Sequence, residues 1–531
     1  MTVPTAITGD PSRVRKRRVI WNSDGEDLTG PAYGRKGFPS QLESVDHFLS
    51  LRMEALLGTQ VDSLFYCAYK RQFVWNHPQE NTRALGPEPL NHVVEFAHRN
   101  SLEFMFSIRM NDSHSSFYPE PRMGKNQWNI KLDHPEWMLA NVSQEEFAGR
   151  FLPWVRGQTA GEPQDPGSPF EDHPLADVYR RRGQASRDFY SWSALDYAHP
   201  GVRAHYLHVV EEACQRYDID GIELDWGRHP FYFQFGEERR HVPVMTDFVR
   251  QVRQRLDYYS QKRDRPILLA MRVADSPDLS LSLGLDAETW IKKGWVDLLI
   301  AGFGYMPFSV PLKDWVCWGH QHGIPVYGCL SKSTRLFSKP EAIRAAAYRH
   351  WQEGVDGIYF FNFFFGQAPG PASEIEPQDY AALYEVGEPA QIAQKNKLYE
   401  IDRHFTAGYM NLSCWPGQLP VAITTQSGSA HTELSLEIAD RPETASRVAI
   451  QAQWQKGTDL NRISYRLNSH ALANPHSLAP EKKDQESFTE YETKDLHQGN
   501  NILEVQVQPS PGTDSAEPLV LQQVRASIDY S

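Results

Sequence analysis

The sequence lacks long hydrophobic runs and is poor in cysteine. No apolar run among its 531 residues approaches the ~18 residues of a membrane-spanning helix, and its mean hydropathy is -0.55. Its five cysteines are scattered and form no Cys-x-x-Cys pair. The sequence therefore predicts no membrane span, no disulfide framework and no cysteine zinc site.

Positive charge is also in deficit. The chain has 54 Lys and Arg against 67 Asp and Glu, a net charge of -13, which argues against a broad nucleic-acid-binding surface. A basic run at residues 15–18 is local, and we expect it to be a solvated segment before the first strand. No glycine-rich phosphate-binding loop is present, and the acidic residues at 24–27 lack the spacing of a calcium loop. We therefore expect no cofactor and no metal.

The start of the sequence shows no signal peptide. Residues 1–10 are polar and contain proline, without the apolar segment that a secretory signal needs. As written, the sequence predicts a cytoplasmic protein. A periplasmic or secreted protein is the alternative if the sequence begins downstream of a leader.

Aromatic residues, in contrast, are abundant. The chain has 14 Trp, 23 Tyr and 26 Phe, which together make up 12% of it. Aromatic rings bury large areas in protein cores, and they also form flat platforms on which sugar rings stack. Because core packing accounts for most of them in any protein, the excess is only a hint of carbohydrate binding.

Eight apolar runs alternate with amphipathic stretches in the first part of the chain. The stretches 202–217, 244–259 and 340–353 have helical periodicity. Apolar strands separated by helices are typical of buried parallel strands, and eight βα units close a TIM barrel. We therefore predict an α/β fold with a (β/α)8 barrel rather than an open doubly wound sheet. The runs are Val19–Trp21, Ser63–Tyr69, Phe104–Met110, Gly221–Trp226, Ile267–Val273, Leu298–Phe303, Pro325–Leu330 and Gly357–Phe364.

The pattern divides the chain into three parts. Residues 1–18 are an N-terminal extension, and 19–386 form the barrel, with a long loop at about 113–200 that should lie over the active face. Beyond about Pro389, short alternating runs separated by turn residues predict an all-β sandwich over 391–531. The sandwich should pack on the barrel, because the linker is short and is not rich in Gly and Ser.

The fourth predicted strand carries the strongest catalytic candidates, since catalytic side chains of TIM barrels come from the carboxyl ends of strands. In the run 220–226, Glu223 and Asp225 alternate with apolar residues, so both carboxylates should face the barrel interior. Two carboxylates this close compete for ionisation, which raises the pKa of one of them, as a general acid or a nucleophile requires. Alternatively, one carboxylate pairs with Arg109 or Arg272 from a neighbouring strand, and we expect this pairing more for Glu223 than for Asp225.

A second catalytic carboxylate should come from another strand. Glu223 and Asp225 leave the same wall, whereas catalytic groups of glycosidases flank the scissile bond. Asp112 is the first choice because it ends the third strand, where the long loop begins. Asp275, after the fifth strand, is the second choice, although Ser276 and Pro277 predict a surface turn there.

Other strand ends provide candidate substrate-binding residues. Arg109 and Arg272 suit a planar anion such as a carboxylate or a sulfate, although they would serve equally to orient Glu223. His114 and His229 are candidate proton carriers, with a plain loop histidine as the alternative for each. The remaining candidates are Tyr69 and Asn362 for hydrogen bonds to sugar hydroxyls, and Trp21, Trp226 and Tyr305 for stacking.

Two sequence stretches have a distinctive order of residues. The first contains Leu195-Asp196-Tyr197, His199-Pro200, Val202-Arg203 and the run from Tyr217 to Trp226; the second contains Leu285-Asp286, Trp290-Ile291 and Gly294-Trp295-Val296-Asp297. Together they resemble the glycosyl-hydrolase-like TIM-barrel proteins of bacteria. The resemblance covers about 19–386 and implies a barrel of the glycoside hydrolase superfamily. The segment His497–Val505 also resembles a hairpin of jelly-roll, galactose-binding-like modules.

The catalytic motifs of better-known glycosidases fit this sequence only in part. Chitinase-like enzymes carry Asp-x-x-Asp-x-Asp-x-Glu on the fourth strand, and Gly227 stands where their acid should be. A large class of retaining enzymes has catalytic glutamates on strands four and seven, but the seventh run of this sequence does not end in a glutamate. The α-galactosidase-like barrels, with an aspartate nucleophile ending strand four, fit Asp225 better, but their acid on strand six has no counterpart near Tyr305.

Three functions remain open from the sequence. The first is a glycoside hydrolase acting on an oligo- or polysaccharide, an anionic one if the arginines bind the substrate. The second is a polysaccharide lyase acting on a uronate-containing glycan, which needs the arginines, a histidine and Tyr305 to converge. The third is a non-catalytic carbohydrate-binding protein, favoured by the missing family acids. A carbohydrate is thus the expected partner, and the oligomeric state is left open.

Overall fold

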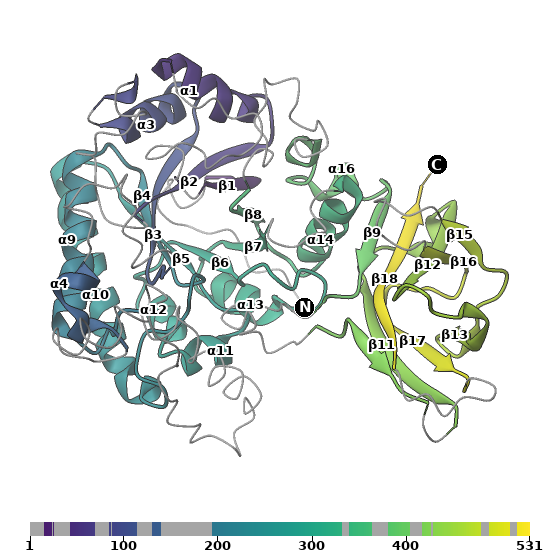
Figure 1. The fold of residues 1–531 in the computed structure, drawn as a ribbon. Helices are drawn as coiled ribbons and strands as arrows, with labels where there is room; N and C mark the ends of the chain where they lie inside the picture. The colour runs from purple at the N-terminus through teal and green to yellow at the C-terminus, as the bar shows by residue number, and fades with distance from the viewer. Residues whose placement is uncertain are drawn as a thin grey trace.

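A computed structural model describes the chain over residues 15–23, 25, 43–69, 84–86, 88–113, 130–139, 194–331, 339–363, 381–403, 417–425, 428–478, 488–509 and 518–530. A closed barrel is followed by two antiparallel sheets (Figure 1). In this part of the chain, no helix combines the length and the apolar character that a membrane crossing requires.

Eight parallel strands close the barrel in chain order, with β8 paired to β1. This confirms the predicted (β/α)8 architecture. The strands are β1 (Val19–Ser23), β2 (Val61–Tyr69), β3 (Glu103–Arg109), β4 (Gly221–Asp225), β5 (Leu268–Arg272), β6 (Leu298–Ala301), β7 (Val326–Ser331) and β8 (Gly357–Phe361).

Helices surround the barrel, and the three stretches with helical periodicity correspond to α9, α10 and α14 (Figure 1). The α-helices are α1 (Val45–Arg52), α3 (Pro89–Arg99), α4 (Ile130–Asp133), α9 (Pro200–Arg216), α10 (Glu238–Arg263), α11 (Pro277–Ser282), α12 (Ala287–Lys292), α13 (Lys313–Gln321), α14 (Pro340–Gln352) and α16 (Pro389–Ile392). Single 3-10 turns are η2 (Glu54–Leu56), η4 (Pro135–Trp137), η7 (Ala382–Tyr384), η9 (Pro442–Thr444) and η10 (Leu460–Arg462).

The barrel strands alternate between two cores. Residues such as Ile222 and Leu224 belong to the large apolar core between strands and helices, whereas a second apolar cluster, which includes Met105, Tyr359 and Phe361, fills the barrel interior. This alternation follows from the two-residue period of a strand. It directs Glu223 and Asp225 of β4 to the interior, as predicted.

The basic run 15–18 is solvated only in its first half: Arg15 and Lys16 are exposed, as expected, whereas Arg17 is buried at the amino-terminal end of the barrel and Arg18 is partly buried. Arg17 is 1% exposed and donates hydrogen bonds of 2.7 and 2.6 Å to the carboxylate of Glu103, which also accepts from the hydroxyl of Ser63. Arg18 pairs with Asp62 at 2.8 Å. A buried arginine needs such a partner, because an unpaired charge is costly to remove from water.

The C-terminal part is all-β, as predicted. One sheet has the order β10-β18-β12-β16-β15, with β9 also paired to β18, and the other has the order β11-β17-β13-β14. Their strands are β9 (Lys397–Glu400), β10 (Val421–Ile423), β11 (Ala430–Ile438), β12 (Arg447–Trp454), β13 (Ile463–Leu467), β14 (His470–Ala471), β15 (His476–Leu478), β16 (Phe488–Glu492), β17 (Gly499–Val507) and β18 (Leu519–Asp529).

The sandwich packs directly on the barrel, with α14 and α16 between the barrel strands and the sheets (Figure 1). Lys397 of β9 places its Nζ 4.6 Å from the ring centroid of Tyr348 in α14. The rings of Phe308, between β6 and α13, and Tyr399 of β9 lie 6.1 Å apart. The Asp402 carboxylate accepts a 3.0 Å hydrogen bond from the amide of Phe308. These contacts agree with the packing expected from the short linker.

Candidate active site

The candidate site is built around Asp225, the last residue of β4. Its Oδ1 accepts two hydrogen bonds, from Arg272 Nε at 2.7 Å and from the amide of Gly227 at 2.8 Å. Its Oδ2 is buried, has no hydrogen-bond partner among the described residues and lies 4.0 Å from Nε of Arg109. One oxygen of Asp225 is therefore fixed by two hydrogen bonds, while the other faces only the Arg109 guanidinium among the described residues, at the carboxyl end of the barrel, where TIM-barrel sites lie.

Arg109, at the end of β3, connects Asp225 to two further predicted site residues. It donates to Asp112 at 2.9 Å and to the side-chain oxygen of Asn362 at 2.5 Å. Asn362 follows β8 and is held in turn by an amide hydrogen bond to Asn22. The structure thus gathers the ends of β3, β4, β5 and β8 into one network, and Asp112 and Asp225 share an arginine.

Glu223 lies one step deeper in the barrel and has a different environment. It is fully buried and accepts a 2.8 Å hydrogen bond from the hydroxyl of Tyr359 on β8, across the interior. Burial and the neighbouring charge of Asp225 raise the pKa of Glu223 to about 7, and Ser107, Arg272 and Tyr359 oppose this shift only in part. The sequence correctly indicated a carboxyl group with a raised pKa on this strand.

The expected preference in arginine pairing was wrong. Within the described part of the chain, the ion pair with Arg272 is made by Asp225 and not by Glu223. The strand register explains the difference, because Asp225 lies beside Arg109 on one side and beside Arg272 on the other. Glu223 instead lies beside Ser107 and Ala270, one residue pair further from the mouth.

One histidine, His229, and one lysine, Lys131, lie near Asp112. His229 is buried, accepts a hydrogen bond from the amide of Ser113 at Nδ1 and lies 3.6 Å from Asp112 Oδ1. Lys131 of α4 is also buried; desolvation lowers its pKa to about 7, and the charge of Asp112 opposes the shift. Asp112 therefore sits among cationic or proton-carrying groups from three segments of the chain.

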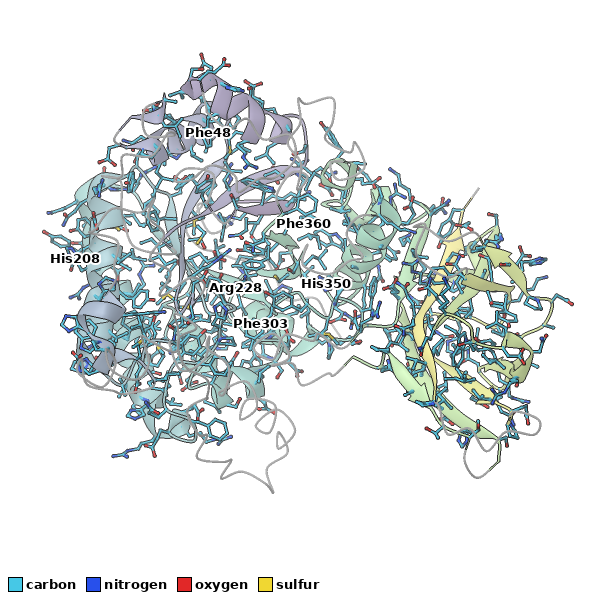
Figure 2. The ribbon with its side chains drawn as sticks, viewed as in Figure 1. Phe48, His208, Arg228, Phe303, His350 and Phe360 are labelled. Carbon is cyan, nitrogen blue, oxygen red and sulfur yellow. The ribbon has the colours of Figure 1, made fainter. Side chains whose placement is uncertain are left out.

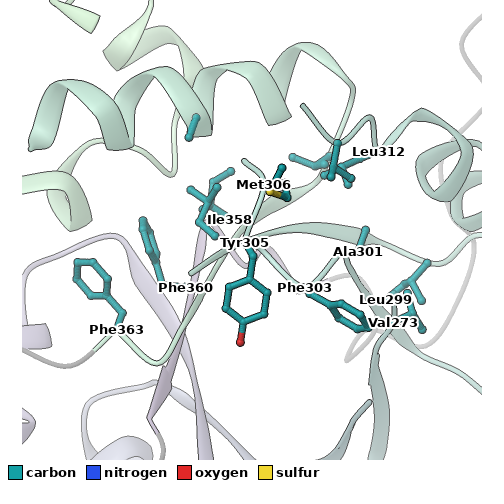
Figure 3. Close-up of a cluster of buried hydrophobic side chains, with 14 of the residues drawn as sticks. Val273, Leu299, Ala301, Phe303, Tyr305, Met306, Leu312, Ile358, Phe360 and Phe363 are labelled. Carbon is teal, nitrogen blue, oxygen red and sulfur yellow. The ribbon is translucent and has the colours of Figure 1, made fainter. Parts of the chain in front are cut away.

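Tyr305 lies in the segment that follows β6. Its ring is 5% exposed, and its hydroxyl, which accepts a 3.1 Å hydrogen bond from Arg228, points away from Met306 and Leu312 (Figure 3). In the view of Figure 2, Arg228 projects onto the middle of the barrel. This polar end of Tyr305 reaches the arginine-rich part of the site, but its buried ring offers little surface for the predicted stacking on a sugar.

The stacking expected of Trp21 and Trp226 is not supported. Trp226 is fully buried in the layer between strands and helices, where its ring contacts the rings of Tyr197, Tyr232 and Trp290. Trp21 is 2% exposed, and its indole donates to the carbonyl of Phe363. The period of two explains both positions, since each tryptophan follows an inward-facing residue of its strand.

Two predicted residues cannot be placed in the site. His114 lies outside the described residues. Tyr69 ends β2, but its side chain lies outside them as well. Asp275, expected on the surface, is 3% exposed and accepts a hydrogen bond from the amide of Phe303, so its carboxylate holds the segment after β6.

Sequence reasoning missed four residues of the site. Phe361 lies under two guanidinium groups, with its ring centroid 3.7 Å from Cζ of Arg272 and 5.4 Å from Cζ of Arg109. Tyr359 holds Glu223, and Arg228 holds Tyr305. The alternation along the predicted strand 357–364 could have placed Tyr359 and Phe361 on one inward face. Gly227 is the fourth, because a Cβ there would lie 2.2 Å from Nη2 of Arg272.

The arrangement suits chemistry at a carbon that gains positive charge. A carboxylate with one fixed oxygen and one unpartnered oxygen can attack such a carbon or stabilise it. No group of three or more His, Cys, Asp or Glu side chains that could hold a metal ion occurs among the described residues.

Comparison with known proteins gives only distant similarity. No protein-family profile matches the sequence, and no curated protein matches it. Among solved structures, an α-amylase from Anoxybacillus is 10% identical, with 93% of this chain and 98% of that chain covered and a TM-score of 0.38. α-L-Fucosidase isoenzyme 2 from Paenibacillus thiaminolyticus is 12% identical, with 71% and 48% covered and a TM-score of 0.39. A GH36 α-galactosidase from Geobacillus stearothermophilus is 10% identical, with 93% and 56% covered and a TM-score of 0.37.

Proposed function

We propose that this protein is a glycoside hydrolase that cleaves an oligo- or polysaccharide, with Asp225 as its nucleophile. The observation that supports this most is the state of the Asp225 carboxylate. Its Oδ1 is fixed by Arg272 and Gly227, and its Oδ2 is buried and accepts no hydrogen bond from any described residue. An unpartnered carboxylate oxygen at the carboxyl end of a barrel strand is positioned to meet the anomeric carbon of a bound sugar.

The proposed reaction uses Asp225 and Asp112 in sequence. Oδ2 of Asp225 forms a bond to the anomeric carbon while the glycosidic bond breaks, and the leaving oxygen takes a proton from the Asp112 carboxyl group. Water then attacks the glycosyl ester, with Asp112 taking its proton, and Asp225 is released as a carboxylate. The product keeps the anomeric configuration of the substrate.

Glu223 has a positioning role in this proposal. It lies below Asp225 and is bonded to Tyr359, away from the strand ends where a substrate would bind. Because its pKa is raised to about 7, Glu223 is mostly neutral below pH 7, which limits the repulsion between two buried carboxylates.

The test is a screen of plant, algal and bacterial polysaccharides, with released sugars separated by chromatography. We expect Asp225→Asn to lower turnover by at least ~10³-fold with an unchanged circular dichroism spectrum, because the amide keeps the size and loses the nucleophile. Asp218→Asn, an exposed residue just before the same strand, is the matched control and should keep full turnover. Full turnover by Asp225→Asn, or inversion of the anomeric configuration by NMR, would contradict the assigned role.

A polysaccharide lyase is the second candidate, favoured by the hydrogen bond between Arg228 and Tyr305 beside the other two arginines. In a lyase, Tyr305 or His229 would remove a proton next to a uronate carboxylate, and the product would contain a new C=C bond. Ultraviolet absorbance of the products separates the two candidates in one assay. Binding of a glycan without any cleavage would instead support a carbohydrate-binding protein.

A further inference from the structure

Two nitrogens of the Arg272 guanidinium donate no hydrogen bond to any described residue. Its side chain is fully buried, and its Nε donates to Asp225. Both Nη1 and Nη2 are buried and have no hydrogen-bond partner within the part of the chain that the structure describes. Leaving charged donors buried and unsatisfied is costly, so a pair of them in one group calls for a ligand.

Phe361 and Gly227 lie against the Arg272 guanidinium and fix the direction in which Nη1 and Nη2 point. Phe361 packs against it, with the ring centroid 3.7 Å from Cζ. Gly227 provides the space beside it, because a Cβ at this position would lie 2.2 Å from Nη2 and 2.7 Å from Nη1. With Nε bonded to Asp225, the edge formed by Nη1 and Nη2 is left for a partner. That edge offers parallel donors, which match the two oxygens of a carboxylate.

The charges nearby also favour an anion. Arg109, Arg228 and Arg272 are contributed by the segments that end β3, β4 and β5; Arg109 pairs with Asp112, and Arg272 pairs with Asp225 through its Nε alone. Glu223 lies deeper and bonds to Tyr359. A neutral sugar could accept from the donors of Arg272, but a carboxylate would do so with charge-assisted hydrogen bonds, which are stronger.

We infer that Arg272 binds the carboxylate of a uronic acid unit, so that the substrate is a uronate-containing glycan cleaved at or next to that unit. The inference rests on the proposed function and names its substrate class. Because Arg272 contacts Asp225 directly, the carboxylate of the sugar would lie beside the nucleophile. The same arginine would then orient the nucleophile and select the substrate.

The test is equilibrium binding to the full-length protein, measured by calorimetry or by NMR line broadening. The probes are glucuronate and galacturonate, their methyl esters, glucose and galactose, and galactose 6-sulfate. We expect one of the uronates to bind at least ~10-fold more tightly than its methyl ester and the neutral hexose, because the ester lacks the charge. Tighter binding of the sulfate, or equal binding of the uronate and its ester, would overturn the inference.

Two variants connect the binding to Arg272. Arg272→Lys removes the pair of parallel donors, Nη1 and Nη2, and Gly227→Ala displaces the guanidinium. Each variant should therefore weaken uronate binding at least ~10-fold. Arg265→Lys, at an arginine that pairs with Asp220 at the opposite end of β4, should bind like the wild type. Unchanged uronate binding in a folded Arg272→Lys or Gly227→Ala protein would contradict the assignment.

Binding without turnover keeps this inference separate from the proposed function. If the protein binds uronates as expected but cleaves no glycan, the hydrolase proposal fails and the uronate site stands. If the protein hydrolyses neutral glycosides and does not bind uronates, the hydrolase proposal stands and the inference of a uronate site is wrong.

Discussion

At the scale of single residues, Glu223 and Asp225 lie on the same face of β4 but accept hydrogen bonds from different kinds of donor. Asp225 accepts from a guanidinium and an amide, while Glu223 accepts from the Tyr359 hydroxyl. Burial and the charge of Asp225 raise the pKa of Glu223, which forms no ion pair among the described residues. In the proposed mechanism, the position of the arginines in the neighbouring strands therefore separates the nucleophile, Asp225, from the positioning residue, Glu223.

This difference predicts how stability depends on pH. The pKa of Glu223 is raised from 4.5 to about 7, so in this window the folded protein holds a proton that the unfolded chain has lost. The contribution of Glu223 is therefore favourable at low pH and is lost as the pH rises towards 7. Glu223→Gln carries no charge, and we expect it to raise the free energy of unfolding by about 3 kcal/mol at pH 8, and by less at pH 5. Urea unfolding at the two pH values checks this; a difference that does not grow with pH would show that Glu223 is ionised in the folded protein.

Asp112 gives a prediction about leaving groups. If it protonates the leaving oxygen, Asp112→Asn should slow substrates with poor leaving groups by at least ~10²-fold, while activated aryl glycosides are affected much less. Turnover of alkyl and nitrophenyl glycosides of the same sugar provides the comparison. Equal loss with both kinds of substrate would mean that Asp112 only positions the sugar through Arg109.

At the scale of elements, the segment between β6 and α13 links the site to the sandwich. It begins near Tyr305, whose hydroxyl meets Arg228, and it is held by residues from outside. Arg349 of α14 donates to the carbonyls of Pro307 and Val310. The Asp402 carboxylate, in the chain beyond β9, accepts from the amide of Phe308. The C-terminal part thus supports a wall of the candidate site.

We therefore expect Asp402 to act as a positioning residue. Asp402→Ala leaves the amide of Phe308 without its partner and should raise KM by about 10-fold with a smaller effect on kcat, because Tyr305 and Arg228 are displaced while Asp225 is not. Asp402→Asn keeps an acceptor oxygen and should restore KM. Steady-state kinetics of the two variants, once a substrate is found, tests this; an equal loss in both variants would indicate a purely structural role.

Elements were more predictable from the sequence than the partners of their side chains. The eight strands could be predicted because each is a continuous apolar run, and the inward direction of Glu223 and Asp225 follows from the period of two. Asp225 pairs with Arg272 because of the register between β4 and β5, and the apolar runs in the sequence do not determine that register. The roles of Gly227 and Arg17 were missed for the same reason, since each depends on a side chain from a strand far away in the sequence.

At the scale of the whole molecule, the barrel and the sandwich share buried contacts. Lys397 of β9 is 1% exposed and pairs with Asp440 at 2.9 Å, which joins the two sheets. Its Nζ also lies 4.6 Å from the ring of Tyr348 on α14 and 5.1 Å from that of Tyr530. On α14, Arg344 donates to Glu385 and to the carbonyl of Asn396. These contacts predict that the two parts unfold together and keep a fixed arrangement in solution.

Lys397 is the residue through which this coupling can be tested. Lys397→Met leaves Asp440 buried without its cation, so we expect the free energy of unfolding to fall by about 3–5 kcal/mol. Asp440→Asn in the same chain removes the unpaired charge and should recover part of that loss. Calorimetry of the wild type should show one transition, and hydrogen exchange in the single variant should increase in α14 as well as in β11. Two separate transitions in the wild type, or faster exchange in the sandwich alone, would mean that the barrel and the sandwich are stable independently. In that case the support of the β6 segment by Asp402 would not couple the sandwich to the candidate site.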